Sequence, residues 1–449
     1  MVAEEDNNMA KFDTYFALAK EKGIEVFELY YSRAKSLSFK LYNAQIEGYK
    51  LSEDISLYAR GIYKGKIGYA STEKISKETA SFLVNEIITN AGTVTKEELA
   101  IIFKGSDKYK KKNIYNPAIA ELSIETKKKN LFDIERKLKA ADKRIAQVDA
   151  CSYQERESEA VLMNSYGLKL KRKSNYYYYY ASVLAIQGQE RKNEGDVHFS
   201  NDLTTLNIDT FVNDITKKAL MKFNGTQCAS KDYKVVLDKD VVSDLLSAYL
   251  DSASAEEVQK KTSLMIGKLN QPVASKKVTI SEMPLKKNEF FTYFDDEGVA
   301  TYNKPIVKKG VLQTYFHNLN TAHNDGVQTT GNGYRSGGKI EIGFRNIVLK
   351  AGRKSLEDIF AQIGDGVYIT EVMGIHASLN PTSGNFSLQA NGFMIENGKR
   401  GVPLTLITVA GNLMDLFMNV KEVANDNKLL PNGYDVPSLW IKKLTISGK

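Results

Sequence analysis

The order of strand-like and helix-like segments limits the fold more than any other feature of this sequence. Strand-like segments come in runs separated by single amphipathic segments, so strands and helices do not alternate one by one. A doubly wound α/β sheet needs that alternation, because a helix normally forms the crossover between parallel strands. The pattern therefore predicts an α+β fold.

The first run reads as a helix, a meander of strands and a second helix. Residues 9–22 place Phe12, Phe16 and Leu18 near helical spacing, and residues 76–90 also show an amphipathic helical pattern. Between them, β-forming residues interrupted by Asn and Gly predict five short strands. The predicted strands are 24–32, 36–43, 46–50, 55–62 and 66–70.

The second run begins after a polar, lysine-rich segment at 95–118, which we expect to lie on the surface. Helices are predicted at 123–142 and 208–223, with strands between 144 and 200. One strand contains five consecutive tyrosines at 176–180. Because alternate residues of a strand face opposite sides, we interpret this run as an aromatic strand beneath a helix. A base-stacking platform is the alternative.

The polar stretch 224–232 predicts a domain boundary. The chain has 449 residues, which is more than one hydrophobic core usually accommodates. We therefore predict two domains: an α+β domain at 1–228, which begins with the helix, meander and helix, and a strand-rich mixed domain at 229–449. The second domain is predicted to contain a strand at 234–237, a helix at 238–253, strands with Gly-rich turns at 277–350 and a helix at 412–419.

Composition and charge argue against several classes of protein. Hydrophobic residues make up 42% and charged residues 26%, no apolar run is long enough to span a bilayer, and the first residues lack the features of a signal peptide. The two cysteines cannot form a disulfide framework, so we expect a cytoplasmic protein with no membrane partner. The net charge of +8 comes from short lysine clusters that we interpret as solvated surface. No nucleic-acid-binding motif is present, so we do not expect a nucleic-acid partner.

The sequence has no histidine arrangement typical of a zinc peptidase. A zincin helix carries two histidines one turn apart, with a glutamate beside the first. None of the four histidines, His198, His317, His323 and His376, is followed by a glutamate. The G-x-S-x-G and Walker A patterns are absent as well. We therefore predict no metal ligand and no catalytic residue in this chain.

Two glycine-containing loops are the candidate binding segments. In the loop 374–387, small residues allow close approach of another backbone, and His, Asn and Ser side chains offer hydrogen-bonding groups. The loop 330–338 combines several glycines with polar side chains. The candidate substrate contacts are His376, Asn380, Ser383, Gly384, Asn385, Asn332 and Arg335.

Several short motifs are spread across nearly the whole chain. They are YSRAKSLS at 31–38, SED at 52–54, GKIGYAST at 65–72, FDDEGV at 294–299, TGN at 330–332, GIHASLNPTSGNFS at 374–387, GFMIENG at 392–398 and ITVAGNL at 407–413. In their residues and their order these segments resemble the TldD/PmbA family, once described as modulators of DNA gyrase and now viewed as peptidases.

The resemblance implies a role that depends on a partner. The catalytic, TldD-like branch carries a His-Glu-x-x-x-His metal helix and a cysteine in the later loop, whereas here the stretch 245–254 has no histidine and the vicinity of Gly374 has no cysteine. The chain is therefore similar to the PmbA (TldE) branch. The resemblance implies a cytoplasmic heterodimer with a zinc-holding TldD-like subunit, no cofactor in this chain, and unfolded or small peptides as substrates. The loops 330–338 and 374–387 are expected to face the substrate path.

Other roles and assemblies stay open at this point. A chain expressed alone can form a homodimer, because a surface meant for a related partner can pair with itself. One alternative function is a self-sufficient peptidase with a divergent site around His376. The other is a non-enzymatic regulator that binds gyrase or DNA, for which the sequence offers only a weak overall basicity.

Overall fold

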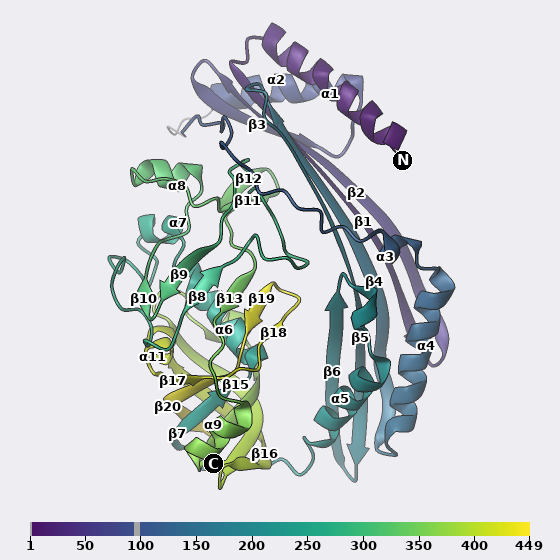
Figure 1. Cartoon of the computed structure of the whole chain (residues 1–449), viewed down its shortest axis with the longest axis vertical. Coiled ribbons are helices and arrows are strands. Elements are labelled where there is room, and N and C mark those ends of the chain that lie inside the picture. The colour runs from purple at the N-terminus through teal and green to yellow at the C-terminus, as the bar shows by residue number, and fades with distance from the viewer. Residues whose placement is uncertain (1, 94–98) are drawn as a thin grey trace.

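The computed structural model describes residues 2–93 and 99–449, which form a long antiparallel sheet and a second body of shorter strands (Figure 1). The strands of the long sheet end at Ser200, and the strands of the second body begin at Lys231. Helices and strands are mixed without regular alternation, which confirms the predicted α+β class. The division into domains at 1–228 and 229–449 stays a prediction.

The long sheet has six strands in the order β3-β2-β1-β4-β5-β6, all antiparallel to their neighbours. Four of these strands have 17 to 20 residues, so the sheet extends along one whole side of the molecule (Figure 1). The strands are β1 (Val26–Tyr42), β2 (Gln45–Tyr63), β3 (Lys66–Thr72), β4 (Ile145–Asn164), β5 (Lys169–Gln187) and β6 (Glu190–Ser200).

The five short strands predicted between 24 and 70 are in fact three continuous strands, β1, β2 and β3. At the predicted breaks, polar side chains pair across β1 and β2. The hydroxyl groups of Ser36 and Ser52 lie 2.8 Å apart, and Arg33 Nε donates to Glu53 Oε1 at 2.5 Å. Because cross-strand pairs of this kind stabilise the ladder, it continues through positions whose residues suggest turns.

Helices cover the two ends of the long sheet, and they confirm the four helices predicted in this part of the chain. In α4, the Ser123 side chain accepts a hydrogen bond from the N–H of Thr126 at the N-cap, and Leu131, Ile134 and Leu138 are buried against the sheet. The helices are α1 (Val2–Glu21), α2 (Lys77–Thr93), α3 (Pro117–Glu121), α4 (Ile124–Ala141) and α5 (Ile208–Leu220), with a 3-10 turn at Leu203–Thr205.

The tyrosine run lies on β5 and alternates between the two faces of the sheet. Tyr177 and Tyr179 are each 1% exposed and belong to the core beneath α4, whereas Tyr180 is 38% exposed. Asn130 on α4 donates its side-chain N–H to the Tyr179 hydroxyl at 3.2 Å. This confirms the interpretation of an aromatic strand beneath a helix.

The second body contains two further six-stranded sheets around one large core. The first has the order β16-β15-β14-β7-β20-β17, and an additional pairing of β16 with β20 closes part of it into a barrel. The second has the order β10-β9-β8-β13-β19-β18, and β11 and β12 form a separate hairpin. The strands are β7 (Lys231–Leu237), β8 (Ile280–Glu282), β9 (Lys304–Lys308), β10 (Val311–Leu312), β11 (Gly333–Ser336), β12 (Lys339–Ile342), β13 (Ile347–Leu349), β14 (Gly366–Met373), β15 (Asn385–Glu396), β16 (Lys399–Asn412), β17 (Val420–Val423), β18 (Lys428–Leu429), β19 (Tyr434–Val436) and β20 (Leu439–Ser447).

Six helices accompany these strands, and α6 directly follows β7 and packs its apolar face into the large core. The predicted helices at 238–253 and 412–419 correspond to α6 and α11. The helices are α6 (Lys239–Asp251), α7 (Ala255–Gln259), α8 (Leu319–Asn324), α9 (Leu356–Ile363), α10 (Ile375–Ser378) and α11 (Leu413–Met418).

The segment 99–116 lies largely on the surface, as predicted, with residues 107, 108 and 110–113 exposed, and it runs between the long sheet and the second body (Figure 1). Ile102 and Ile114 are buried. The Tyr109 hydroxyl donates to the carbonyl of Gly298 at 2.7 Å, which ties the segment to the second body. Two inward-facing isoleucines therefore anchor a segment whose composition is otherwise polar and lysine-rich. Residues 95–98 of this prediction lie outside the described residues.

Gly68 on β3 is required by the close approach of α2. A Cβ atom at this position would lie 2.0 Å from the carbonyl oxygen of Ile87. We expect Gly68→Ala to lower the free energy of unfolding by about 1–3 kcal/mol, because α2 must move off the sheet. Gly48→Ala is the matched control on β2, since no atom lies within 4 Å of its Cβ, and urea unfolding should show a change within about 0.5 kcal/mol.

Candidate functional site

The loop 374–387 is shaped by a left-handed glycine, the short helix α10 and a tight turn. Gly374 has a φ of 81°, a conformation that glycine adopts without strain. The Asn380 side chain accepts hydrogen bonds from the N–H groups of Thr382 at 3.0 Å and Ser383 at 2.9 Å. His376, Asn380, Ser383 and Asn385 are exposed, and Gly384 is buried. The loop therefore presents polar side chains to the solvent.

Asn412, at the end of β16, anchors the far side of the same loop. Its side-chain N–H donates to the carbonyl of Ser383 at 2.8 Å and to Asn385 Oδ1 at 2.9 Å. Gly384 has a φ of 74°, and a Cβ there would lie 2.9 Å from the Leu264 side chain. The glycine and the asparagine together fix the position of the loop. The structure thus brings five of the seven predicted contact residues together on one loop.

Helix α6 carries several carboxylates, and one of them, Asp244, interacts electrostatically with His376 of this loop. Burial raises the pKa of Asp244, the charge of Asp240 raises it further, and His376 lowers it. Near the end of the helix, desolvation raises the pKa of Asp251 to about 6, with a smaller contribution from Glu257. The polar side chains of α6 are Lys, Asp, Ser and Tyr, with no histidine or cysteine.

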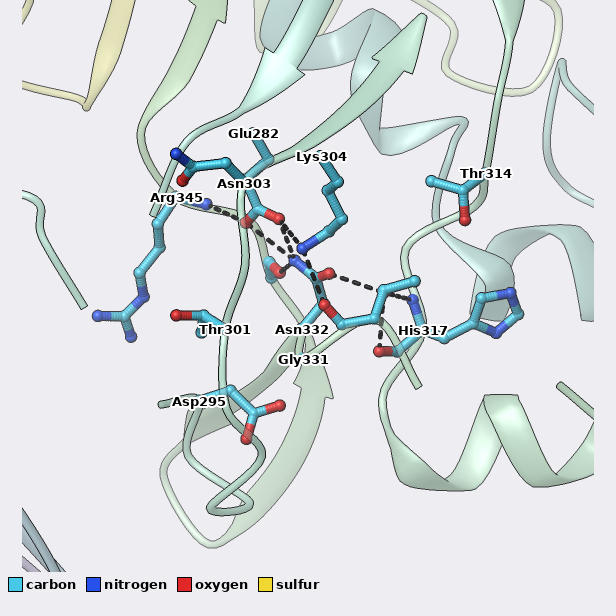
Figure 2. A network of polar contacts seen from close by, with 12 residues as sticks. Glu282, Asp295, Thr301, Asn303, Lys304, Thr314, His317, Gly331, Asn332 and Arg345 are labelled. Carbon is cyan, nitrogen blue, oxygen red and sulfur yellow. Dashed lines mark hydrogen bonds and ion pairs between the residues drawn. The ribbon is translucent and has the colours of Figure 1, made fainter. Parts of the chain in front are cut away.

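Asn332 belongs to a buried network rather than to an open loop (Figure 2). Its amide nitrogen donates to both oxygens of Glu282, at 2.9 and 3.1 Å, and to the carbonyl of Gly343 at 2.8 Å. Lys304 Nζ lies 2.5 Å from Glu282 Oε2 and donates to the carbonyl of Thr330 at 2.8 Å. Because the protein itself occupies these groups, Asn332 holds the loop 330–338 in place.

The carboxylate of Asp296 joins the long sheet to the second body. Its Oδ1 accepts hydrogen bonds from the Tyr30 hydroxyl on β1 at 2.8 Å and from Arg172 Nη2 on β5 at 2.5 Å. Its Oδ2 accepts from the backbone N–H of Arg335 at 2.9 Å, and Arg345 Nη2 lies 3.6 Å away. Burial alone would raise the pKa of Asp296, but Arg172 and Arg345 hold it well below its usual range.

The Arg335 side chain forms a second set of contacts with the long sheet. Its guanidinium lies over the rings of Tyr30 and Tyr58, 4.8 and 5.5 Å from their centroids, and 3.6 Å from Glu28 Oε1. Glu28 also accepts a hydrogen bond from Arg60 Nε at 2.6 Å. Arg335 is therefore a buried part of the junction, in a different environment from the exposed loop 374–387.

Two pockets lie next to this junction. The first has a volume of about 590 Å³ and lies between β3, the beginning of α8 and β12, with Arg60, Glu297 and Tyr69 among its lining residues. The second has a volume of about 420 Å³ and is lined by residues 111–114, 171–174 and 289–293 with Arg345. Both volumes are in the range of small-ligand and peptide sites.

The four histidines lie on different elements. His198 on β6 lies 3.3 Å from the hydroxyls of Tyr177 and Thr205, and His323 is on α8. His317 is buried, and its desolvation lowers its pKa and favours the neutral imidazole. Among residues 2–93 and 99–449, no group of three His, Cys, Asp or Glu side chains is arranged to hold a metal ion. In the same ranges, no helix is long and apolar enough to cross a membrane.

Three family models match the chain in consecutive order. They are the PmbA/TldA metallopeptidase domain 1 at residues 27–91, the central domain at 117–223 and the C-terminal domain at 230–448. Together they cover most of the sequence. The chain therefore belongs to the PmbA/TldD metallopeptidase family, which confirms the resemblance found in its motifs.

Individual relatives agree with the family match over nearly the full length. A metalloprotease PmbA homolog of Haemophilus influenzae is 26% identical over 434 residues, which cover 94% of this chain and 92% of the relative. Metalloprotease PmbA of Escherichia coli O157:H7 is 23% identical and covers 96% of this chain and 94% of the relative. A role in peptide hydrolysis is thus supported at the level of the family.

Solved structures share the whole fold. A Thermotoga maritima protein, described as a candidate modulator of a DNA gyrase, has a TM-score of 0.90 and 28% identity, with 98% of this chain and 100% of that chain covered. TldE from Thermococcus kodakarensis has a TM-score of 0.88 and 23% identity, with 97% and 100% covered. The second likeness is one of fold alone.

Sequence reasoning missed the charged residues of the junction. Glu28 and Arg60 lie on neighbouring strands and look like solvent-facing positions, and Glu282 and Lys304 lie in segments read only as strands with turns. The motif FDDEGV at 294–299 was noticed through its resemblance to the family. Its three adjacent carboxylates, with few lysines beside them, were the signal that could have marked a buried ionic site.

The Asp296 carboxylate should contribute strongly to stability above acidic pH. Its pKa is lowered in the folded state, so its contribution is fully present well above the unfolded value of 3.8 and is lost as the pH falls below that value. We expect Asp296→Asn to lower the free energy of unfolding at neutral pH by about 3–5 kcal/mol, because the Arg172 guanidinium loses its carboxylate partner and Arg345 loses a longer contact.

Urea unfolding at neutral pH measures the loss of stability in Asp296→Asn, and thermal unfolding across the acidic range measures how the contribution of Asp296 depends on pH. Glu53→Gln is the control, because it removes an exposed ion pair with Arg33 and should change stability by less than about 1 kcal/mol. Equal effects of the two substitutions would contradict a special role for the junction.

Proposed function

We propose that this chain is the PmbA/TldE-like, non-catalytic subunit of a two-subunit cytoplasmic metallopeptidase. A TldD-like subunit would hold the zinc, and the substrates would be unfolded or small peptides. The observation that carries the proposal is the composition of α6 and its neighbouring loop. In the catalytic, TldD-like branch of the family, the resemblance implies that this region supplies the metal ligands, whereas here it offers carboxylates and the single imidazole of His376.

The donor groups of the region do not fit a peptidase zinc site. Such sites combine two or three histidines with a carboxylate or thiolate and leave one position for water. The charge of His376 lowers the pKa of Asp244 on α6, but the other histidines lie on other elements. Cys151 and Cys228 are buried, and burial raises the pKa of the Cys151 thiol to about 12. We therefore derive no hydrolytic step through a metal in this chain.

The part we assign to this subunit is to shape the substrate path. His376, Asn380, Ser383 and Asn385 are exposed on one anchored loop, and they can exchange hydrogen bonds with the main chain of an extended peptide. Contacts with the peptide main chain suit substrates of varied sequence. Asn332 and Arg335 would support this surface indirectly. The hydrogen bonds of Asn332 hold the loop 330–338 in place, and the charge contact of Arg335 with Glu28 holds that loop against the long sheet.

Reconstitution with a TldD-like subunit tests the proposal. We expect the purified chain to lack stoichiometric zinc and to leave an unfolded peptide intact, and the mixture with a TldD-like subunit to elute as one complex and cleave the peptide. Zinc analysis, size-exclusion chromatography and a cleavage assay of each chain alone and together measure this. Chelator-sensitive cleavage by this chain alone would instead support a self-sufficient peptidase, and salt-dependent DNA binding without cleavage in the mixture would support a regulator.

A substitution in the exposed loop should affect substrate binding more than chemistry. In the reconstituted complex, we expect His376→Ala to raise KM by about 2–10-fold with little change in kcat, because one hydrogen bond to the substrate is lost and no reacting group is removed. His323→Ala on α8 is the control and should change neither value. A loss of kcat without a change in KM would place His376 in the chemical step and contradict the assigned role.

A further inference from the structure

The edge of β5 is open along part of its length. β5 pairs with β4 from Lys169 to Ala185, but β6 pairs with it only from Tyr177 onward. In this open stretch, the Tyr293 hydroxyl lies 3.3 Å from the backbone nitrogen of Lys171 and also donates to the carbonyl of Lys171. Because alternate residues of a strand direct their N–H and C=O groups to the same side, the backbone of Lys173 points to this open side too.

The 420 Å³ pocket lies at this open edge. Residues 171–174 form one wall, residues 111–114 and 289–293 form the others, and Arg345 completes the lining. The backbone groups of Lys171 are already bound by Tyr293, so the main chain of Lys173 is the part of this edge that can pair with an extended peptide, with side-chain contacts on the other sides.

The pocket is strongly basic. Six of its described lining side chains are cations, Lys111, Lys112, Lys171, Arg172, Lys173 and Arg345, against one carboxylate, Glu289. Carboxylates behind the wall neutralise part of this charge: Glu159 lies 3.0 Å from Lys171 and Glu157 lies 3.2 Å from Lys173. The cations still outnumber the carboxylates when these partners and Asp296 are included.

Lys111 and Lys112 carry the uncompensated charge. Both are exposed, and within residues 2–93 and 99–449 no ion pair joins either of them to a carboxylate. The nearby Glu157 shows how a carboxylate is stabilised here: burial would raise its pKa, but hydrogen bonds from Tyr115 and Lys173 and the charge of Lys173 lower it. An incoming carboxylate would be stabilised in the same way.

The aromatic side chains of the pocket are already occupied by neighbours. The ring of Phe290 stacks on Phe199, with centroids 5.6 Å apart and an angle of 22°, and Tyr293 packs edge-on against Phe294 and Tyr109. Binding of single-stranded nucleic acid relies on open aromatic faces on which bases stack. The combination of an open backbone edge, free lysines and occupied rings favours a peptide over a nucleic acid.

We propose that this pocket binds an acidic segment of a peptide in extended conformation along the open edge of β5, with Lys111 and Lys112 contacting its carboxylates. The choice of a peptide rests on the proposed function, and the proposal assigns to this subunit a preference for substrates that contain Asp or Glu. The site is separate from the loop 374–387, so it would position a substrate away from the exposed polar loop.

Binding to the chain alone tests the site without any cleavage. The probe is a fluorescein-labelled hexapeptide of alternating Glu and Val, measured by fluorescence anisotropy at low salt. We expect the double variant Lys111→Glu/Lys112→Glu to weaken binding by about tenfold or more, since two attractive charges become repulsive. The matched control is Lys108→Glu/Lys110→Glu, which changes the net charge equally in the same exposed segment outside the pocket, and should weaken binding by less than about threefold.

Two modified peptides test the chemistry of recognition without any change in the protein. Replacing Glu by Gln should abolish measurable binding, and methylating alternate backbone nitrogens of the Glu peptide should weaken it by about tenfold, because a paired strand loses its donors. Equal effects of the two double variants, full binding of the Gln peptide, or tighter binding of an oligonucleotide through Lys111 and Lys112 would overturn the proposal. Because no partner is present, these outcomes are independent of whether reconstitution yields a peptidase.

Discussion

The buried carboxylate of Asp296 is the interaction on which the arrangement of the molecule depends. It accepts hydrogen bonds from a tyrosine and an arginine of the long sheet and from a backbone N–H of the β11–β12 hairpin. A buried ion pair contributes little net stability compared with well-packed apolar residues, but breaking one is strongly unfavourable. The junction therefore selects one relative orientation of the two bodies, because a displaced sheet would leave several charges buried without partners.

The same junction explains why the two predicted loops differ in character. The loop 330–338 is held through Asn332, whose amide reaches Glu282, and through Arg335, whose guanidinium packs on two tyrosines of the long sheet. The loop 374–387 is held by local hydrogen bonds and by its contacts with the end of β16 around Asn412, and its exposed side chains are available to a ligand. A binding surface needs both kinds of segment, since exposed contacts recognise a substrate only where a rigid framework fixes their positions.

The sequence was informative wherever the signal is local. Helical spacing located the helices, and the alternation of a strand explained why Tyr177 is buried and Tyr180 is exposed. Prediction from the sequence failed where the environment of a residue depends on a partner far away along the chain. Ser36 and Ser52 look like turn residues until they pair across strands, and Tyr30 and Asp296 are 266 positions apart. No periodicity connects such residues, so the buried ionic junction and the pocket beside it could be found only from the three-dimensional arrangement.

The non-catalytic role that we propose would depend on shape and charge, and this structure separates the two. Shape is set at the junction, where the charges of Glu28, Arg60 and Asp296 are buried and matched by partners. Positive charge is available at the open edge of β5, where lysines and arginines together outnumber the nearby carboxylates. Carboxylates lie on α6, where burial and the charge of a neighbouring carboxylate raise the pKa of Asp240 and Asp244. The basic edge of β5 and the carboxylates of α6 would attract opposite charges of a peptide that binds as we propose.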